Sequence, residues 1–208
     1  MMSDWRYRFW DLEAAVLLIK EHYSWFLPTF ESYDSVVAKG DALRPVILHA
    51  FGGLYLDLDV ECYRPADRFL AGHDLVLQAE ESNGNALINA VMASTARHPF
   101  WLRVLELMKE RVGSAHNVLY ATGPQVVSEA YKTHGKLSGG GSGVPVSLRG
   151  HGMQKKLTPH VYGLGEFYLP CNWLSQDLCA QVGNAETKPA HLAGFHHWAG
   201  SWKIIQVG

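Results

Sequence analysis

Two aspartates stand one residue apart in FGGLYLDLDVECYRP, residues 51–65. If this alternating segment is a strand, Asp57 and Asp59 point to the same side, ~6.6 Å apart. Carboxylates held this close repel each other unless a cation lies nearby, and their hard oxygens suit Mg²⁺ or Mn²⁺. We expect one aspartate to bind the metal ion and the other to accept a hydrogen bond from a hydroxyl or a metal-bound water.

The apolar face of the same segment predicts where the aspartates lie. Burial of that face would turn the carboxylates to the other side of the sheet. Its residues are Leu54, Leu56, Leu58 and Val60. We therefore expect Asp57 and Asp59 at the C-terminal end of a central strand, open to a cleft. The tripeptide alone is a weak signal, because Asp-x-Asp also occurs by chance.

Two motifs around the aspartates are more specific. The segment GDALRPVILHAFGGLYLDLDVECYRPAD resembles the Asp-x-Asp region of glycosyltransferase family 32, which the large clostridial glucosylating toxins share. The residues that match the family pattern are Asp41, Arg44, Gly52, Gly53, Tyr55, Asp57, Asp59 and Pro65. Near the C-terminus, FHHWAGSWK resembles the family's His-x-Trp-x-x-Ser-Trp ending through His196, Trp198, Ser201 and Trp202. The two motifs occur in the family's order.

The resemblance implies a fold and an activity. It implies a GT-A-like fold, here one α/β domain over residues 1–208 with a mostly parallel central sheet flanked by helices. It also implies a metal-dependent, retaining transfer of a hexose from GDP-mannose or a UDP-hexose to a glycan, glycolipid or protein. Family members include inositolphosphoceramide and α-1,6-mannosyltransferases. The cofactor implied is Mn²⁺ or Mg²⁺.

The resemblance also assigns roles to individual positions. It implies that Asp59 and His196 bind the metal ion, and that Asp57, Asp59 and Arg44 are the catalytic residues. The implied substrate-binding residues are Asp41, Arg44, Tyr55, Asp57, Ser201 and Trp202. A metal ion and hydrogen-bond donors at the diphosphate would stabilise the charge of the leaving group.

Plainer interpretations stand beside these roles. The separation of three residues between Asp41 and Arg44 is also that of an ordinary surface ion pair on a helix. His197 is the rival of His196 as metal ligand, because it begins a His-x-x-Gly that some related transferases use. Trp202 could also simply be a residue of the hydrophobic core.

Three function classes remain open at this stage. The family normally begins with an apolar strand that ends in a His-x-x-Trp-like segment, and this sequence starts after that point. A non-catalytic nucleotide-sugar or glycan-binding module from a decayed transferase is therefore an alternative. A haloacid-dehalogenase-type phosphatase is the weaker one, because Glu61 stands where that class usually has Thr or Val.

Composition limits the partners. The net charge of −2 gives no electrostatic reason to expect nucleic acid, and no apolar run approaches the ~20 residues of a membrane span. Three scattered cysteines form no disulfide or zinc pattern. The sequence does not fix the localisation: we expect a soluble chain, cytoplasmic if complete and Golgi-type lumenal if an N-terminal anchor precedes it.

The expected elements alternate between strands and helices, which favours an α/β sandwich. Alternation predicts a strand over residues 5–10, and Asp11 caps a helix that follows it. Pro45 predicts that the next helix begins close to Asp41 or kinks, and Gly52-Gly53 end it. Residues 85–112 fit two helices, the second opened by Pro99. Gly and Ser indicate a flexible loop over about 136–151.

Overall fold

The computed structural model describes residues 5–80, 86–137, 159–163, 166–170 and 192–197. Its helices are α1 (Leu12–His22), α2 (Leu27–Glu31), α3 (Val36–Phe51), α4 (Asp67–Leu70), α5 (Phe100–Glu110), the 3₁₀ turn η1 (Val112–Ser114), α6 (Val118–Ala121) and α7 (Pro124–Leu137). Its strands are β1 (Gly53–Leu56), β2 (Val60–Cys62), β3 (Leu75–Ala79), β4 (Leu87–Ser94), β5 (His160–Tyr162), β6 (Tyr168–Pro170) and β7 (Gly194–His196).

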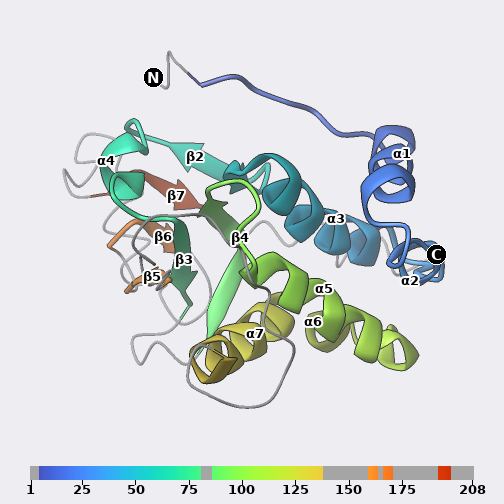
Figure 1. Ribbon diagram of the computed structural model, residues 1–208. Coiled ribbons are helices and arrows are strands. Elements are labelled where there is room, and N and C mark those ends of the chain that lie inside the picture. Colours follow the sequence, from blue (N-terminus) through green and yellow to red (C-terminus); the bar gives the residue numbers. More distant parts are fainter. Residues whose placement is uncertain (1–4, 81–85, 138–158, 164–165, 171–191, 198–208) are drawn as a thin grey trace, which may run out of the picture.

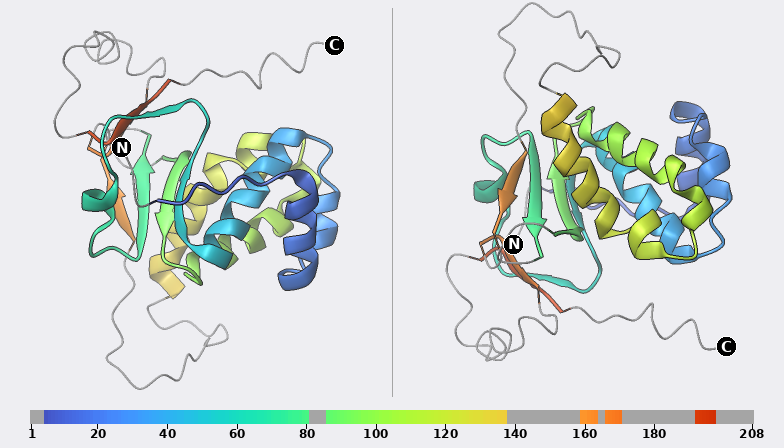
Figure 2. Two further views of the ribbon diagram at one scale, coloured as in Figure 1. Left: turned by 90° about the horizontal axis from the view of Figure 1, so that it is seen from above. Right: turned by 90° about the horizontal axis from the view of Figure 1, so that it is seen from below.

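The strands form two sheets in a layered α/β arrangement, which confirms the predicted fold class. A four-stranded sheet has the order β1-β4-β3-β5, and a three-stranded sheet has the order β2-β7-β6. The larger helices cover one face of the four-stranded sheet, and the smaller sheet and α4 lie on its other side (Figures 1 and 2). No helix in the described part of the chain is long and apolar enough to cross a membrane.

Burial on both faces of the larger sheet divides the core in two. On the helical side, Leu75 and Leu77 of β3 pack with Trp101 and Leu105 of α5. On the other side, Val76 packs in a second cluster that includes aromatic residues from outside the sheet. A strand buried on both faces has no polar side, because each face needs apolar residues. All five residues of β3 are buried.

The prediction of a mostly parallel sheet is wrong for the described strands. β1 with β4, β3 with β4, and β2 with β7 are antiparallel, whereas β3 with β5 and β6 with β7 are parallel. A short connection reverses the chain between β3 and β4, and so favours antiparallel pairing. The sequence shows the alternation of elements but not the order in which strands become neighbours.

One helix cap agrees with the prediction, whereas the start of the next predicted helix does not. Asp11 caps α1, accepting a hydrogen bond from Ala14 N at 2.8 Å, as expected. The helix with Pro45 begins at Val36, five residues before the predicted start. Ser35 caps it by accepting from Ala38 N at 3.4 Å, and the helix accommodates Pro45 in its interior. The cap decided the start, since a proline removes only one donor.

One strand prediction and one helix prediction are wrong. Residues 5–10 are extended but belong to no strand in the described structure, because alternation favours an extended backbone and a strand also needs a neighbour. Residues 87–94, predicted as helical, form β4, which is buried on both sides. A short apolar run without alternation does not distinguish a buried strand from a helix. The helix opened by Pro99 is confirmed as α5.

Residues 54–61 are two strands separated by a turn, not one strand. Val60 N donates to Asp57 O at 3.1 Å and closes the turn. Leu58, predicted to be buried, is 96% exposed at its tip. β1 also lies at an edge of the described sheet, so the expected central strand is wrong. Asp is common in turns, a preference that the alternating pattern of this segment conceals. Of the predicted loop, residues 136 and 137 belong to α7, and 138–151 lie outside the described residues.

Replacing Gly52 by Ala should destabilise the junction between α3 and β1 by more than about 2 kcal/mol. Gly52 caps α3 with φ +67°, and an added Cβ would lie 2.5 Å from Ala96 N and 2.8 Å from Ser94 O. The free energy of unfolding, measured with urea, tests this.

Gly40→Ala is the matched control in the same helix. A Cβ at Gly40 meets nothing within 4 Å, so alanine should raise the free energy of unfolding by about 0.5–1 kcal/mol through helix propensity. Equal urea midpoints for the two variants would contradict the claim that the positive φ and close contacts of Gly52 exclude a Cβ at this position.

Candidate active site

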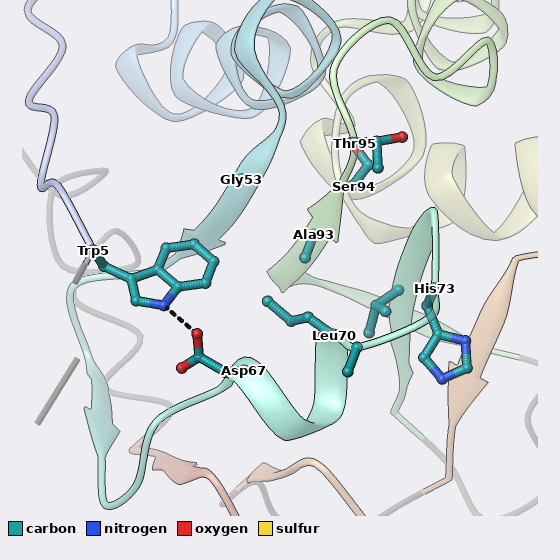
Figure 3. A pocket seen from close by; sticks show the side chains of 10 residues that line it. Trp5, Gly53, Asp67, Leu70, His73, Ala93, Ser94 and Thr95 are labelled. Carbon is teal, nitrogen blue, oxygen red and sulfur yellow. Dashed lines mark hydrogen bonds between the residues drawn. The ribbon is translucent and has the colours of Figure 1, made fainter. Parts of the chain in front are cut away.

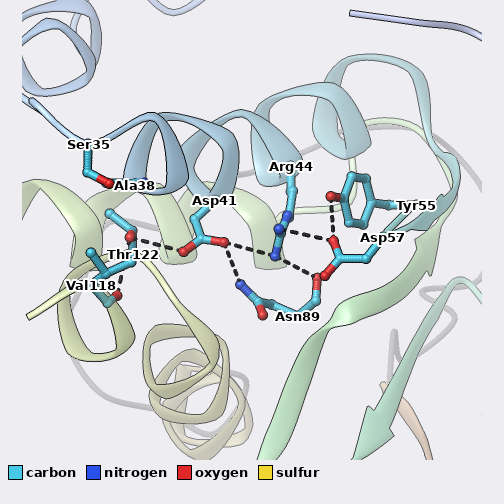
Figure 4. A network of polar contacts seen from close by, with 9 residues as sticks. All are labelled: Ser35, Ala38, Asp41, Arg44, Tyr55, Asp57, Asn89, Val118 and Thr122. Atoms are coloured by element: carbon cyan, nitrogen blue, oxygen red, sulfur yellow. Dashed lines mark hydrogen bonds and ion pairs between the residues drawn. The ribbon is translucent and has the colours of Figure 1, made fainter. Parts of the chain in front are cut away.

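Arg44 joins helix α3 to the aspartate turn. Its Nη1 lies 2.8 Å from Asp41 Oδ1, and its Nη2 lies 3.0 Å from Asp57 Oδ1 (Figure 4). Nη1 also donates to the carbonyl of Asn89 in β4 at 3.2 Å. Asp41 and Arg44 lie on one helical face because they are three residues apart. The structure thus brings Asp41, Arg44 and Asp57 together, whereas the roles assigned to them stay predictions.

Tyr55 completes the surroundings of Asp57. Its hydroxyl donates to Asp57 Oδ1 at 2.7 Å, and its ring lies 4.9 Å from the guanidinium carbon of Arg44. One oxygen of Asp57 thus accepts from both the guanidinium and the phenol. Burial raises the pKa of Tyr55, which keeps the phenol protonated as the donor at neutral pH.

Burial and charge act against each other along this network. Burial raises the pKa of Asp41 to about 6, although Arg44 opposes the shift. Burial also acts to lower the pKa of Arg44, but the nearby Asp41, Tyr55 and Asp57 raise it above its ordinary value. The guanidinium therefore stays charged, and Asp41 is mostly ionised at pH 7.

His196 reaches the aspartate turn from the far end of the chain. In the β2–β7 pairing it stands opposite Val60, and its Nε2 lies 3.2 Å from Asp59 Oδ1. A backbone hydrogen bond from His197 N to Asp59 O, 2.9 Å long, holds the strand to the turn. Burial lowers the pKa of His196, although Asp59 opposes this. The imidazole is therefore neutral at pH 7, which is the state that binds a metal ion.

The two neighbouring histidines point to different sides of β7. The side chain of His196 is 5% exposed beside Asp59, whereas that of His197 is 51% exposed beside Glu61. Consecutive residues of a strand face opposite ways. The strand thus separates the two candidates: only His196 lies with the aspartates.

The donor set of Asp57, Asp59 and His196 fits a divalent cation. One ligand atom from each lies within 4.8 Å of the others. Ligand atoms around an ion at ~2.1 Å are at most ~4.2 Å apart, so atoms at the 4.8 Å limit would have to approach one another when an ion binds. Two carboxylates with one imidazole suit Mn²⁺, which accepts both oxygen and nitrogen.

The predicted site residues differ in how far their side chains are exposed to solvent. The side chains of Asp57 and Asp59 are 25% and 26% exposed, so solvent and ligands reach both carboxylates. Asp41 is buried, and its assignment as a contact to sugar hydroxyls stays a prediction. Ser201 and Trp202 lie outside the described residues.

A separate pocket lies at the other end of β1. It has a volume of about 320 Å³ and is lined by Trp5, Gly53, Leu70 and His73 among others. Trp5 forms one wall, where its indole donates to Asp67 at 3.1 Å (Figure 3). Among the described residues, none with a role assigned from the sequence lines this pocket.

Two residues of the network had no signal in the sequence motifs. Asn89 Nδ2 donates to Asp41 Oδ1 at 2.9 Å, and Thr122 Oγ1 lies 3.2 Å from Asp41 Oδ2. Asn89 interrupts an apolar run, which is the one hint that the sequence offers. Thr122 precedes Gly123 and Pro124, and the sequence favours Thr122 or Gly123 as the cap of the helix that follows.

Comparisons with known proteins agree with this site. Residues 1–76 match the family model described as the glycosyltransferase sugar-binding region containing the DXD motif. The mannosyl phosphorylinositol ceramide synthases CSH1 and SUR1 of Saccharomyces cerevisiae are 33% and 41% identical over 139 and 106 residues. These alignments cover 65% and 51% of this chain, and 36% and 27% of the relatives.

A third relative and one solved structure complete the comparison. Inositol phosphoceramide mannosyltransferase 1 of Schizosaccharomyces pombe is 38% identical over 98 residues, 47% of this chain and 30% of the relative. The solved PaToxG glycosyltransferase is 21% identical with a TM-score of 0.44, covering 58% of this chain and 43% of its own. The chain spans about a third of the length of the curated relatives it matches. The family resemblance of the sequence motifs is confirmed over residues 1–76, which match the sugar-binding region of the Asp-x-Asp glycosyltransferases.

Proposed function

We propose that this chain binds a nucleotide-sugar and a divalent metal ion, and transfers a hexose to a glycolipid. The convergence of Asp57, Asp59 and His196 carries the proposal, because residues over a hundred positions apart place their ligand atoms within 4.8 Å. Mannose is the hexose that we favour, since the relatives named above are mannosyltransferases of inositol phosphoceramide. Retention of configuration is the outcome that the family resemblance implies.

In this proposal Asp59 and His196 hold the metal ion, preferably Mn²⁺. The ion supplies positive charge at the diphosphate, where negative charge accumulates as the glycosidic bond breaks. The buried, neutral imidazole adds a directional ligand to the carboxylate, which favours Mn²⁺ over Mg²⁺. His197 points away from this position, and this supports His196 as the ligand.

Arg44 and Asp57 would position the sugar part of the donor. Asp57 accepts from Arg44 and Tyr55 through Oδ1, which leaves Oδ2 directed to a ribose or sugar hydroxyl. The fixed guanidinium limits the rotation of the carboxylate, so its position is set before the donor binds. Preorganised polar groups of this kind lower the reorganisation needed during reaction. Ser201 and Trp202 would bind the diphosphate, as the motif implies.

The other function classes give different assay results. A transferase releases nucleoside diphosphate slowly from the matching nucleotide-sugar, even without acceptor. A non-catalytic module would bind the nucleotide-sugar and release nothing. A phosphatase would cleave a phosphomonoester instead. A thermal-shift panel of GDP- and UDP-sugars, with and without Mn²⁺, identifies the donor because a ligand of the folded state raises stability.

His196→Ala should weaken Mn²⁺ binding at least tenfold, because it removes one of the two proposed protein ligands and leaves Asp59. Isothermal titration with Mn²⁺ alone measures this. His197→Ala is the matched control, since that imidazole pairs with exposed Glu61 and should leave Mn²⁺ affinity unchanged. A loss with His197→Ala and none with His196→Ala would move the ligand by one residue.

Asp59→Asn should lower the transfer rate by about a thousandfold, if the ion contributes several kcal/mol at the leaving group. Release of nucleoside diphosphate from the donor that the thermal-shift panel selects is the measurement. Glu61→Gln, an exposed carboxylate two residues on, serves as the control and should retain the wild-type rate. A rate for Asp59→Asn within threefold of wild type would disprove the metal assignment. His196→Ala should lose less activity than Asp59→Asn, and added Mn²⁺ should restore part of it.

A further inference from the structure

We propose that Thr122 is a positioning residue of the donor site, acting through Asp41 on Arg44. The effect on activity rests on the proposed function. The chain of contacts from Thr122 through Asp41 to Arg44 rests on the geometry of the described residues alone. Thr122 follows helix α6, whereas Asp41 and Arg44 belong to α3. The hydroxyl therefore ties the site to a part of the chain that the sugar-binding motif does not include.

Asp41 is enclosed, with a donor for each of its oxygens. Oδ1 accepts from Arg44 Nη1 at 2.8 Å and from Asn89 Nδ2 at 2.9 Å, and Oδ2 lies 3.2 Å from Thr122 Oγ1 (Figure 4). The residue is 4% exposed. In this arrangement the carboxylate has little surface for a sugar hydroxyl. Its hydrogen bonds instead fix the side of Arg44 that faces away from Asp57.

The hydroxyl of Thr122 has one proton and two possible acceptors. Its oxygen lies 3.2 Å from Asp41 Oδ2 and also 3.2 Å from the carbonyl of Val118. A hydrogen bond to an ionised carboxylate is the stronger of the two. The proton therefore points to Asp41 while that group is ionised, and it can turn to Val118 when Asp41 is protonated.

Arg44 transmits the position of Asp41 to the site. Its two terminal nitrogens contact different carboxylates, Asp41 and Asp57. A planar guanidinium cannot rotate at one nitrogen without moving the other. Loosening Asp41 thus lets the guanidinium turn and weakens its contact with Oδ1 of Asp57, the residue whose Oδ2 we assign to the donor.

Ionisation of Asp41 gives the connection a dependence on pH. The charged and titratable groups that act on this carboxyl are Arg44 in α3, Asp57 after β1 and Tyr33 before α3. The Thr122 hydrogen bond lowers the pKa of Asp41 against the effect of burial, which raises it to about 6. Removing that bond raises the pKa further, so Asp41 becomes protonated at a higher pH and loses its charge interaction with Arg44.

Thr122→Val, which keeps the shape and removes the hydroxyl, tests the inference. The affinity of this variant for the nucleotide-sugar in the presence of Mn²⁺ should fall about tenfold at pH 7. This is the size expected when one hydrogen bond to a charged group is lost. The acidic limb of the activity profile should move to higher pH. Thr122→Ser keeps the hydroxyl and should restore both. Thr133→Val is the control, because that hydroxyl donates only to carbonyls within α7 and should behave as wild type.

A second measurement does not depend on activity. In ¹⁵N–¹H spectra of the guanidinium groups, the two terminal nitrogens of Arg44 should give separate signals in the wild type, since each is hydrogen-bonded. Thr122→Val, or Asp41→Asn if the first variant does not fold, should merge them through faster rotation. If no nucleotide-sugar shifts the thermal stability of the wild type, the proposed function fails. The spectra still test whether Thr122 positions Arg44 through Asp41. Unchanged Arg44 signals, or a loss that Thr122→Ser does not restore, would overturn the inference.

Discussion

The interaction on which the site depends is the guanidinium of Arg44 held between Asp41 and Asp57. It joins a buried helix position to a partly exposed turn, and so transfers the rigidity of α3 to Asp57, the residue that we propose contacts the donor. Removing one partner of such a pair leaves a buried charge uncompensated, which costs about 3–5 kcal/mol. The motif that identifies the sugar-binding region is therefore also part of the structure that holds α3 against the sheet.

The charges around Arg44 support the cation site that we propose. Asp41, Asp57 and Asp59 are three carboxylates, Arg44 is one guanidinium, and His196 is neutral because burial lowers its pKa. At neutral pH the cluster thus carries two negative charges, which a divalent ion would balance. Arg44 neutralises the buried carboxylate of Asp41 and also holds Asp57 in position. The excess negative charge lies at Asp57 and Asp59, the two residues that remain accessible.

Spacing along the chain predicted the local part of this site but not the tertiary part. The separation of three between Asp41 and Arg44, and the glycines that end α3, were enough to bring Arg44 to Asp57. The turn at Leu58 was missed because alternation in residues 54–60 imitates a continuous strand. Asn89 and Thr122 contact Asp41 across 48 and 81 residues, and no periodicity encodes such a contact. The strand β4 was mistaken for a helix because burial on both faces removes the alternation that would reveal it.

Sheet pairing, and not residue chemistry, distinguishes the two histidines. Both imidazoles could bind a metal ion, and the sequence left the choice between them open. The antiparallel register of β2 with β7 places His196 opposite Val60, at the end of the aspartate turn. A shift of one residue would exchange the faces of the strand and bring His197 to Asp59. The hydrogen bond from His197 N to Asp59 O fixes that register at the turn itself. The backbone of one histidine thus positions the side chain of the other.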